Sequence, residues 1–386
     1  MNIALYQPWI YLHGGIERSI LELVRRSRHE WTIYTGYFEP ENTFPEFKDL
    51  NITELTRLTV KRDIFSVLTV GVRIFFQTIP LDNVDALVIW CDGMGDLAVF
   101  RNHGKPVFNI CSTPLRPVFD PVYIQHALSI RPWHSRLFFH LFKALFSRID
   151  RLAWKKYTGV IATSMEVKQR ILHGQLYRDD DQLEIYYPGI DWQAAEPIRE
   201  VSGQTLLIPG RIMWSKNIEL AIRAFIQAEL PAPWKLVIAG FVDRKSTIYL
   251  QDLKKLAAGC SRIIFLESPP DTRMQELYRD AAVVLFPPLN EDWGIVPLEA
   301  MANARPVIAN NRGGPAESIR HGETGWLLAP TAEAWSRQLR ALPRLTDELK
   351  KMGNAARLYS RQYDWSLFTG GIDTALESWC TGDNRH

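Results

Sequence analysis

Short apolar runs alternate along this chain with segments whose apolar residues recur at helical spacing. Residues 15–26 show the helical pattern, with apolar side chains at Ile16, Ile20, Leu21, Leu23 and Val24. The strand-like runs fall into two series: NIALYQP (2–8), WTIYTGYF (31–38), DALVIWC (85–91), PVFNICS (106–112) and GVIATS (159–164), then TLLIPG (205–210), WKLVIAG (234–240), RIIFLE (262–267), AAVVLF (281–286) and RPVIAN (305–310). Strands that alternate with helices form parallel sheets covered on both faces. The sequence therefore predicts an α/β protein with two doubly wound parallel sheets.

The length supports two domains, because 386 residues exceed what one typical core organises. The run YYPGIDW at 186–192 separates the two series and marks the joint. We expect a first domain over 1–187, a second over 188–365, and a terminal helix over 366–386 that returns to the first domain.

Composition narrows the class of protein. Lys plus Arg total 45 and Asp plus Glu 43, so a net charge of +2 gives no reason to expect a nucleic acid partner. Four scattered cysteines form no CxxC pair and no metal-ligand spacing, as in reduced cytosolic proteins. Residues 1–12 read as a first strand and not as a signal peptide, and Arg73 and Gln77 interrupt the longest apolar stretch at 64–80. We expect a cytoplasmic protein, peripheral on the cytoplasmic face if it meets a membrane.

Open parallel sheets bind ligands beyond the carboxyl ends of their strands. Gly14 and Gly15 lie between the first strand and the first helix, where glycines admit a ligand and a helix N-terminus attracts an anion. The alternative is a plain tight turn. Arg211 and Lys216 follow the strand at 205–209, and two cations there suit a diphosphate. The alternative is a pair of solvated surface charges.

The run NEDWGIVPLEAMAN (290–303) carries two carboxylates eight positions apart around a helix entry. Glu291 falls in the predicted loop, and Glu299 lies on the helix among small apolar residues. One ligand with a sugar, a diphosphate and a ribose can meet Glu291, the helix N-terminus and Glu299 in turn. The alternative treats Glu291 and Asp292 as charges matched to the helix dipole, and it leaves Glu299 unexplained.

Together, PGRIMWSKN, EDWGIVPLEAMANARPVIANNRGGPAESI and GETGWLL resemble the carboxyl-terminal domain of family 4 glycosyltransferases, and HGGIERS resembles that family's first glycine loop. The resemblance is specific over roughly residues 205–330. It implies the GT-B fold, with two Rossmann-like domains facing across a cleft, and retaining transfer from a nucleotide-diphosphate sugar without a metal or other cofactor. By position, Arg211 and Lys216 would stabilise the leaving diphosphate, Glu291 would contact the donor sugar and Glu299 the ribose. Donor contacts would also come from the residues Gly14, Gly15, Trp293, Gly294 and Ile295.

The run CSTPLRPVFD (111–120) resembles a stretch of some mannosyltransferases of the family, which makes Ser112, Arg116 and Asp120 acceptor-side candidates. This chain has Ser112 where those proteins have a histidine, and Phe119 where they have a tryptophan. Without that histidine, the sequence does not determine which sugar is transferred. Any catalytic histidine is also undetermined, with His13, His103 and His126 as the candidates. Pro288 likewise replaces the family's usual serine.

Residues 131–156 hold seven Lys or Arg against Asp150, with apolar residues at helical spacing from Phe138 to Leu152. Such a helix binds an anionic membrane surface or packs into the core with a solvated basic face. We expect a glycosyltransferase that acts on a glycan or lipid-linked acceptor in cell-surface polysaccharide or lipopolysaccharide assembly, with mannose from GDP-mannose as one candidate for the sugar and its donor. The alternatives are a non-catalytic nucleotide-sugar or glycan-binding protein and a GT-B epimerase or phosphorylase. The sequence makes no prediction of oligomeric state.

Overall fold

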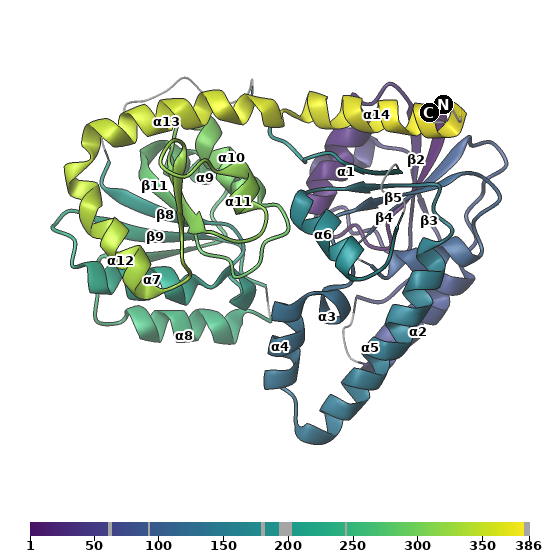
Figure 1. Cartoon of the computed structure of the whole chain (residues 1–386), viewed down its shortest axis with the longest axis horizontal. Helices are drawn as coiled ribbons and strands as arrows, with labels where there is room; N and C mark the ends of the chain where they lie inside the picture. Colours follow the sequence, from purple (N-terminus) through teal and green to yellow (C-terminus); the bar gives the residue numbers. More distant parts are fainter. Residues whose placement is uncertain (61–63, 92, 179–181, 193–202, 244, 382–386) are drawn as a thin grey trace. The chain divides into compact units, whose positions relative to one another are not determined.

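The chain forms two compact units in a computed structural model that describes residues 1–60, 64–91, 93–178, 182–192, 203–243 and 245–381. Met1–Pro188 and Trp365–His386 make up the first unit, and Gly189–Asp364 the second (Figure 1). The sequence predicted these boundaries after residues 187 and 365.

The first unit is built on a seven-stranded parallel sheet in the order β3-β2-β1-β4-β5-β6-β7. Its strands are β1 (Asn2–Tyr6), β2 (Glu30–Thr35), β3 (Ile52–Glu54), β4 (Ala86–Cys91), β5 (Val107–Cys111), β6 (Gly159–Ala162) and β7 (Leu183–Ile185). The order reverses beside β1, so the carboxyl ends of β1 and β4 flank the switch point where open α/β sheets bind ligands.

Helices cover this sheet because its central strands are apolar on both faces. They are α1 (Gly15–Arg26), α2 (Ile64–Phe76), α3 (Arg116–Phe119), α4 (Pro121–Ser129), α5 (Trp133–Trp154), α6 (Met165–His173) and α14 (Trp365–Thr381), with short 3-10 turns at η1 (Pro45–Asp49) and η2 (Gly95–Phe100). Both α2 and α5 pack against η2.

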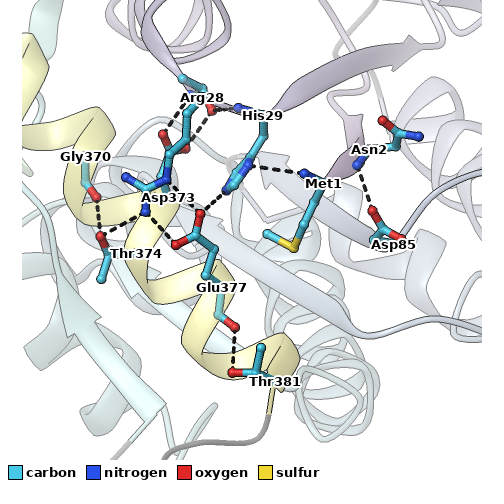
Figure 2. A network of polar contacts seen from close by, with 11 residues as sticks. Met1, Asn2, Arg28, His29, Asp85, Gly370, Asp373, Thr374, Glu377 and Thr381 are labelled. Carbon is cyan, nitrogen blue, oxygen red and sulfur yellow. Dashed lines mark hydrogen bonds and ion pairs between the residues drawn. The ribbon is translucent and has the colours of Figure 1, made fainter.

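The last helix, α14, packs against α1 in the first unit (Figure 1). Its Trp379 ring stacks on Phe108 of β5 at 5.5 Å. Figure 2 shows the polar side of the contact, where the buried Asp373 accepts hydrogen bonds from Ser27 Oγ (2.6 Å) and the Arg28 amide (3.0 Å). Arg28 also pairs with Glu377 at 2.6 Å. Although distant in sequence, α14 is therefore part of the first unit's packing.

The second unit has a six-stranded parallel sheet in the order β10-β9-β8-β11-β12-β13. Its strands are β8 (Thr205–Pro209), β9 (Lys235–Gly240), β10 (Ile263–Glu267), β11 (Ala281–Phe286), β12 (Val307–Asn310) and β13 (Gly325–Leu328). The helical elements are η4 (Trp214–Lys216), α7 (Ile218–Ala228), α8 (Thr247–Ala257), α9 (Asp271–Asp280), α10 (Ile295–Ala302), α11 (Pro315–Ser318), α12 (Ala332–Ala341), η5 (Leu342–Arg344), α13 (Thr346–Ser360) and η6 (Arg361–Tyr363). Here the order reverses between β8 and β11.

The structure confirms the predicted pair of parallel α/β sheets and each strand predicted from an apolar run. The sequence did not predict the helix at 64–76 or the short edge strands β3, β7 and β13. Such short edge strands carry too few residues for a recognisable period, and they exist because a neighbouring strand supplies their hydrogen bonds.

Candidate active site

The carboxyl ends of β8, β11 and β12 lie side by side in the second unit, and the predicted donor residues follow them. Arg211 comes two residues after β8 and is exposed. Lys216 ends the 3-10 turn η4, and Glu291 lies in the loop between β11 and α10. The fold thus places these charges at the predicted edge of the sheet, at its switch point.

Lys216 and Glu291 form an ion pair. The Lys216 Nζ donates to Glu291 Oε2 at 2.6 Å, and each side chain keeps 21% of its surface exposed. The ammonium group also lies 5.6 Å from the centre of the Phe286 ring. A charge-assisted hydrogen bond at this distance orders both side chains, yet their partial exposure leaves both open to a polar ligand.

The loop that carries Glu291 packs closely on a pair of glycines from the β12–α11 connection. The Gly314 amide donates to the Glu291 carbonyl oxygen at 2.9 Å. A Cβ atom at Gly313 would overlap that same carbonyl oxygen, and one at Gly314 would overlap the carbonyl of Trp293. Gly313 also has a φ of 64°, a value that side chains disfavour. The sequence alone does not reveal this contact, because nothing local shows which backbone these glycines face.

Helix α10 begins at this loop without a side-chain cap. Gly294 occupies the N-cap position with a φ of 94°, and the first turn of the helix has no acidic residue. By contrast, the start of α7 is capped, because the Ile218 amide donates to the Tyr249 hydroxyl at 3.0 Å. The buried Trp293 ring packs edge-on against Tyr363, with centroids 5.2 Å apart. The start of α10 therefore suits an anion from a ligand better than that of α7.

Glu299 lies on α10 and has a protein partner. The Tyr278 hydroxyl, from α9, donates to Glu299 Oε2 at 2.6 Å. Burial raises the pKa of Tyr278 well above its usual value, and the Glu299 carboxylate raises it further. This bond explains how a carboxylate is tolerated among small apolar residues. A contact between Glu299 and a ribose stays a prediction.

The first unit holds the remaining candidates at the carboxyl ends of β1 and β5. Gly14 is the N-cap residue of α1, and a Cβ atom there would overlap the carboxylate of Glu17. Glu17 belongs to the first turn of α1 and is buried, so a carboxylate of the chain itself already lies at this helix start. An anion contact at Gly14 or Gly15 stays a prediction.

Of the acceptor-side candidates, Ser112 accepts a hydrogen bond from the indole N–H of the buried Trp90 at 2.8 Å. Asp120 is fully buried and caps α4, where it accepts from the Val122 amide at 2.9 Å. It also pairs with Arg116 (3.5 Å) and Arg170 (3.6 Å). The structure thus gives Asp120 a structural role in this conformation, whereas contact of Ser112 or Arg116 with an acceptor stays a prediction.

The three candidate histidines have ordinary surroundings. His13 packs on Phe44, with ring centroids 4.7 Å apart, and His103 Nδ1 lies 3.1 Å from the Val99 carbonyl oxygen. Burial, together with Arg131, lowers the pKa of His126. None of these contacts singles out a catalytic histidine.

The part of the chain that the structure describes contains neither a cluster suited to a metal ion nor a helix suited to spanning a membrane. No group of three or more His, Cys, Asp or Glu is arranged there to hold a metal ion. Within the same residues, no helix is both long enough and apolar enough to cross a membrane.

Comparison with known proteins identifies the chain. Residues 194–359 match the family model of glycosyl transferases group 1. The alpha-1,3/1,6-mannosyltransferase alg-2 of Neurospora crassa is 26% identical, over 89% of this chain and 84% of that protein. A mannosyltransferase with the same name from Rhizomucor pusillus is 24% identical, over 96% and 89%. The chain is a GT-B glycosyltransferase.

Solved structures share the fold of this glycosyltransferase. HepE of Anabaena, crystallised in complex with UDP and glucose, gives a TM-score of 0.74 at 17% identity, covering 98% of this chain and all of that one. Sucrose-phosphate synthase of Thermosynechococcus elongatus gives 0.76 at 17% identity, covering 99% and 100%. The GT-B fold predicted from the sequence resemblance is confirmed.

Proposed function

We propose that this glycosyltransferase moves a sugar, with retained anomeric configuration, from a nucleoside diphosphate sugar to a hydroxyl group of a glycan or glycolipid. The observation that carries the proposal is the Lys216–Glu291 ion pair beside the uncapped start of α10. These groups offer a cation and backbone amides to a diphosphate, and a carboxylate to sugar hydroxyls. The UDP complex of HepE supports this class of donor.

The chemistry follows from the charges. The bond between sugar C1 and the phosphate oxygen breaks, and its electron pair stays on the diphosphate. Lys216, Arg211 and the amides at the start of α10 stabilise that growing negative charge. The acceptor oxygen bonds to C1 on the face that the phosphate leaves, and its proton passes to the departing phosphate oxygen. Glu291 exchanges Lys216 for a donor hydroxyl and orients the sugar, while Glu299, held by Tyr278, binds the ribose.

We propose mannose as the transferred sugar and GDP-mannose as the favoured donor. The support is that two similar proteins are named alpha-1,3/1,6-mannosyltransferases. We further place the reaction in cell-surface polysaccharide or lipopolysaccharide assembly, at the cytoplasmic face of a membrane.

Substitution of the ion pair tests the reaction. Lys216→Ala should reduce kcat with the active donor by about 100-fold or more, as loss of a transition-state charge partner does. Lys254→Ala is the matched control, because Lys254 forms a comparable ion pair with Glu267 on the same unit (2.5 Å) and should leave kcat unchanged. Donors to be screened are GDP-mannose, UDP-glucose and ADP-glucose, with nucleotide release and transfer as readouts.

The rival functions have their own outcomes in this assay. Binding of a nucleotide sugar with no turnover, unaffected by Glu291→Ala, would indicate a binding protein. A free epimerised sugar would indicate an epimerase, and a sugar phosphate formed with inorganic phosphate a phosphorylase.

The proposed mechanism needs no metal ion, because Lys216, Arg211 and the start of α10 supply the positive charge that a divalent cation otherwise provides. Activity should therefore survive EDTA. An activity that EDTA abolishes and Mn²⁺ restores would contradict this part of the proposal.

The surface of α5 supports a membrane-bound acceptor. Trp133, Leu137, Leu141 and Leu145 are 80%, 75%, 65% and 57% exposed, and their spacing of four places them on one face. Of the stripe predicted from the sequence, Phe138, Leu141, Leu145 and Leu152 are exposed, whereas Phe142 and Ile149 are partly buried. Exposed basic residues flank it: Arg136, Arg148, Lys155 and Lys156. Over about 18 Å of helix, this surface suits insertion at an anionic bilayer surface.

Vesicle binding tests this surface. Leu141→Glu should weaken co-sedimentation with vesicles of phosphatidylcholine and phosphatidylglycerol, because it puts a carboxylate among anionic headgroups. Leu358→Glu is the matched control, since Leu358 on α13 is 66% exposed and Leu141 65%. Equal loss in both variants, or no binding by the unmodified protein, would contradict the assignment.

A further inference from the structure

The segment that carries Glu291 begins with two consecutive prolines, Pro287 and Pro288, directly after β11. Both are buried. Proline has no amide proton, so this segment offers the rest of the protein only its carbonyl oxygens as bonding groups. Buried carbonyls need donors, and here the donors must come from other elements.

Asn310 and Asn217 supply those donors. The Asn310 Nδ2 group donates to the Pro287 oxygen at 2.7 Å and to the Pro288 oxygen at 2.9 Å. The Asn217 Nδ2 group donates to the Pro287 oxygen at 3.2 Å. Both asparagines are more than nine-tenths buried. Among the described atoms nothing donates to the Asn310 Oδ1, so the known bonds of this side chain all serve the two prolines.

The two asparagines come from the elements that flank the site. Asn217 immediately follows Lys216 and has a left-handed backbone conformation, with a φ of 50°. Asn310 ends β12, the strand beside β11. The next residue of the loop is also tied down, because the Leu289 amide donates to the Ser215 oxygen at 3.3 Å. The segments that carry Lys216 and Glu291 are therefore joined to each other at Pro287 and Leu289.

We propose that Asn217 and Asn310 are positioning residues that set the geometry between Lys216 and Glu291 by holding the Pro287–Pro288 carbonyls. Neither amide needs to touch a substrate for this role. The inference rests on the proposed function only for its kinetic readout, since the Lys216–Glu291 ion pair can be followed without a nucleotide sugar.

The first measurement is the rate at which an amine-acylating reagent modifies Lys216, read by peptide mass spectrometry against the exposed Lys254. Asn310→Leu keeps the side-chain size and removes the donor, and it should increase Lys216 modification severalfold because the ion pair loosens. Asn217→Gly should act in the same direction. Glycine accepts the left-handed conformation, so this second variant keeps the test valid if Asn310→Leu fails to fold.

Asn102→Leu is the matched control. Asn102 is buried to the same 2% exposure as Asn310, and its Nδ2 also donates to two backbone carbonyls, of Gln77 and Ala98, at 2.8 Å. It lies in the first unit, whereas the proline segment belongs to the second. Asn102→Leu should lower thermal stability while leaving Lys216 modification at the unmodified protein's rate.

The kinetic measurement separates positioning from binding. With an active donor, Asn310→Leu should lower kcat by up to about 100-fold, the effect of misplacing a reacting group by an ångström, while donor KM changes far less. Unchanged Lys216 modification in both folded variants, or an equal change in Asn102→Leu, would overturn the inference. If modification rises as expected but the unmodified protein transfers no sugar from any donor, the proposed function fails and the positioning role stands.

Discussion

At the scale of single residues, two glycines allow a close contact between backbones beside Glu291. Gly313 and Gly314 allow the β12–α11 connection to reach the backbone of the Glu291 loop, where any Cβ atom would overlap a carbonyl oxygen. The position of Glu291 thus depends on atoms that two residues lack, as well as on its ion pair with Lys216.

Gly313→Ala should lower transfer activity and thermal stability together, because the new methyl group displaces the Glu291 carbonyl. The control is Gly322→Ala, since Gly322 also has a positive φ, of 80°, but nothing lies within 4 Å of a Cβ atom there. Gly322→Ala should lower the free energy of unfolding by only about 1 kcal/mol, the cost of placing a side chain on a left-handed backbone, and it should leave activity intact. Similar activity in the two alanine variants would count against close packing at Gly313.

A second residue-scale prediction concerns Asp150, a fully buried carboxyl group on α5. Burial raises the pKa of Asp150 well above its usual value, and the carboxylate of Asp96 raises it further. Because the pKa is higher in the folded state than in the unfolded state, this group favours folding at low pH, and that contribution is lost as pH rises through the folded pKa.

Asp150→Asn should therefore stabilise the protein at neutral pH. The difference in unfolding free energy between variant and unmodified protein should grow above the ordinary carboxyl pKa, by at most about 1.4 kcal/mol per pH unit, and level off beyond the folded pKa. Urea unfolding between pH 4 and pH 9 measures it. A variant that is less stable at every pH would show that the carboxylate is ionised and paired in the folded protein.

At the scale of elements, α14 is held on α1 by contacts that differ in burial (Figure 2). Asp373 is 2% exposed and accepts from Ser27 and Arg28, whereas the Arg28–Glu377 pair is 50% and 41% exposed. Because solvent screens the exposed Arg28–Glu377 pair, the buried Asp373 carboxylate should contribute more to the stability of the contact between α14 and α1.

Asp373→Ala should destabilise the first unit by about 1–3 kcal/mol, because the Ser27 hydroxyl and Arg28 amide lose their acceptor. Glu377→Ala should have a much smaller effect. Hydrogen exchange of α1 and α14 measures both, and faster exchange in the Glu377 variant than in the Asp373 variant would reverse this ranking.

At the scale of the whole molecule, each unit has its own hydrophobic core. The second unit is continuous in sequence and contains Arg211, Lys216, Glu291 and the start of α10. A nucleoside diphosphate should therefore protect the second unit directly, by binding its folded form.

Among UDP, GDP and ADP, the nucleotide whose base the protein recognises should raise its melting temperature. The expected stabilisation is about 2.7 kcal/mol at a ligand concentration of 100 times Kd. Hydrogen exchange should slow at the loops after β8 and β11. Protection confined to the first unit would contradict the assignment of Lys216 and Glu291 to the donor.

The two parallel α/β sheets could be predicted from the sequence, since strand and helix periods are local properties that a run of side chains shows directly. The sequence also predicted that Arg211, Lys216 and Glu291 lie at the carboxyl edge of the second sheet, because loops at the carboxyl ends of neighbouring parallel strands converge. Only the tertiary structure revealed the amides of Asn217 and Asn310 on the proline carbonyls, the close approach of Gly313, and Tyr278 on Glu299. Those contacts join residues from 21 positions apart, as for Tyr278 and Glu299, to 70 positions apart, as for Asn217 and Pro287. No local pattern encodes such pairs, because each forms only when separate elements pack against one another.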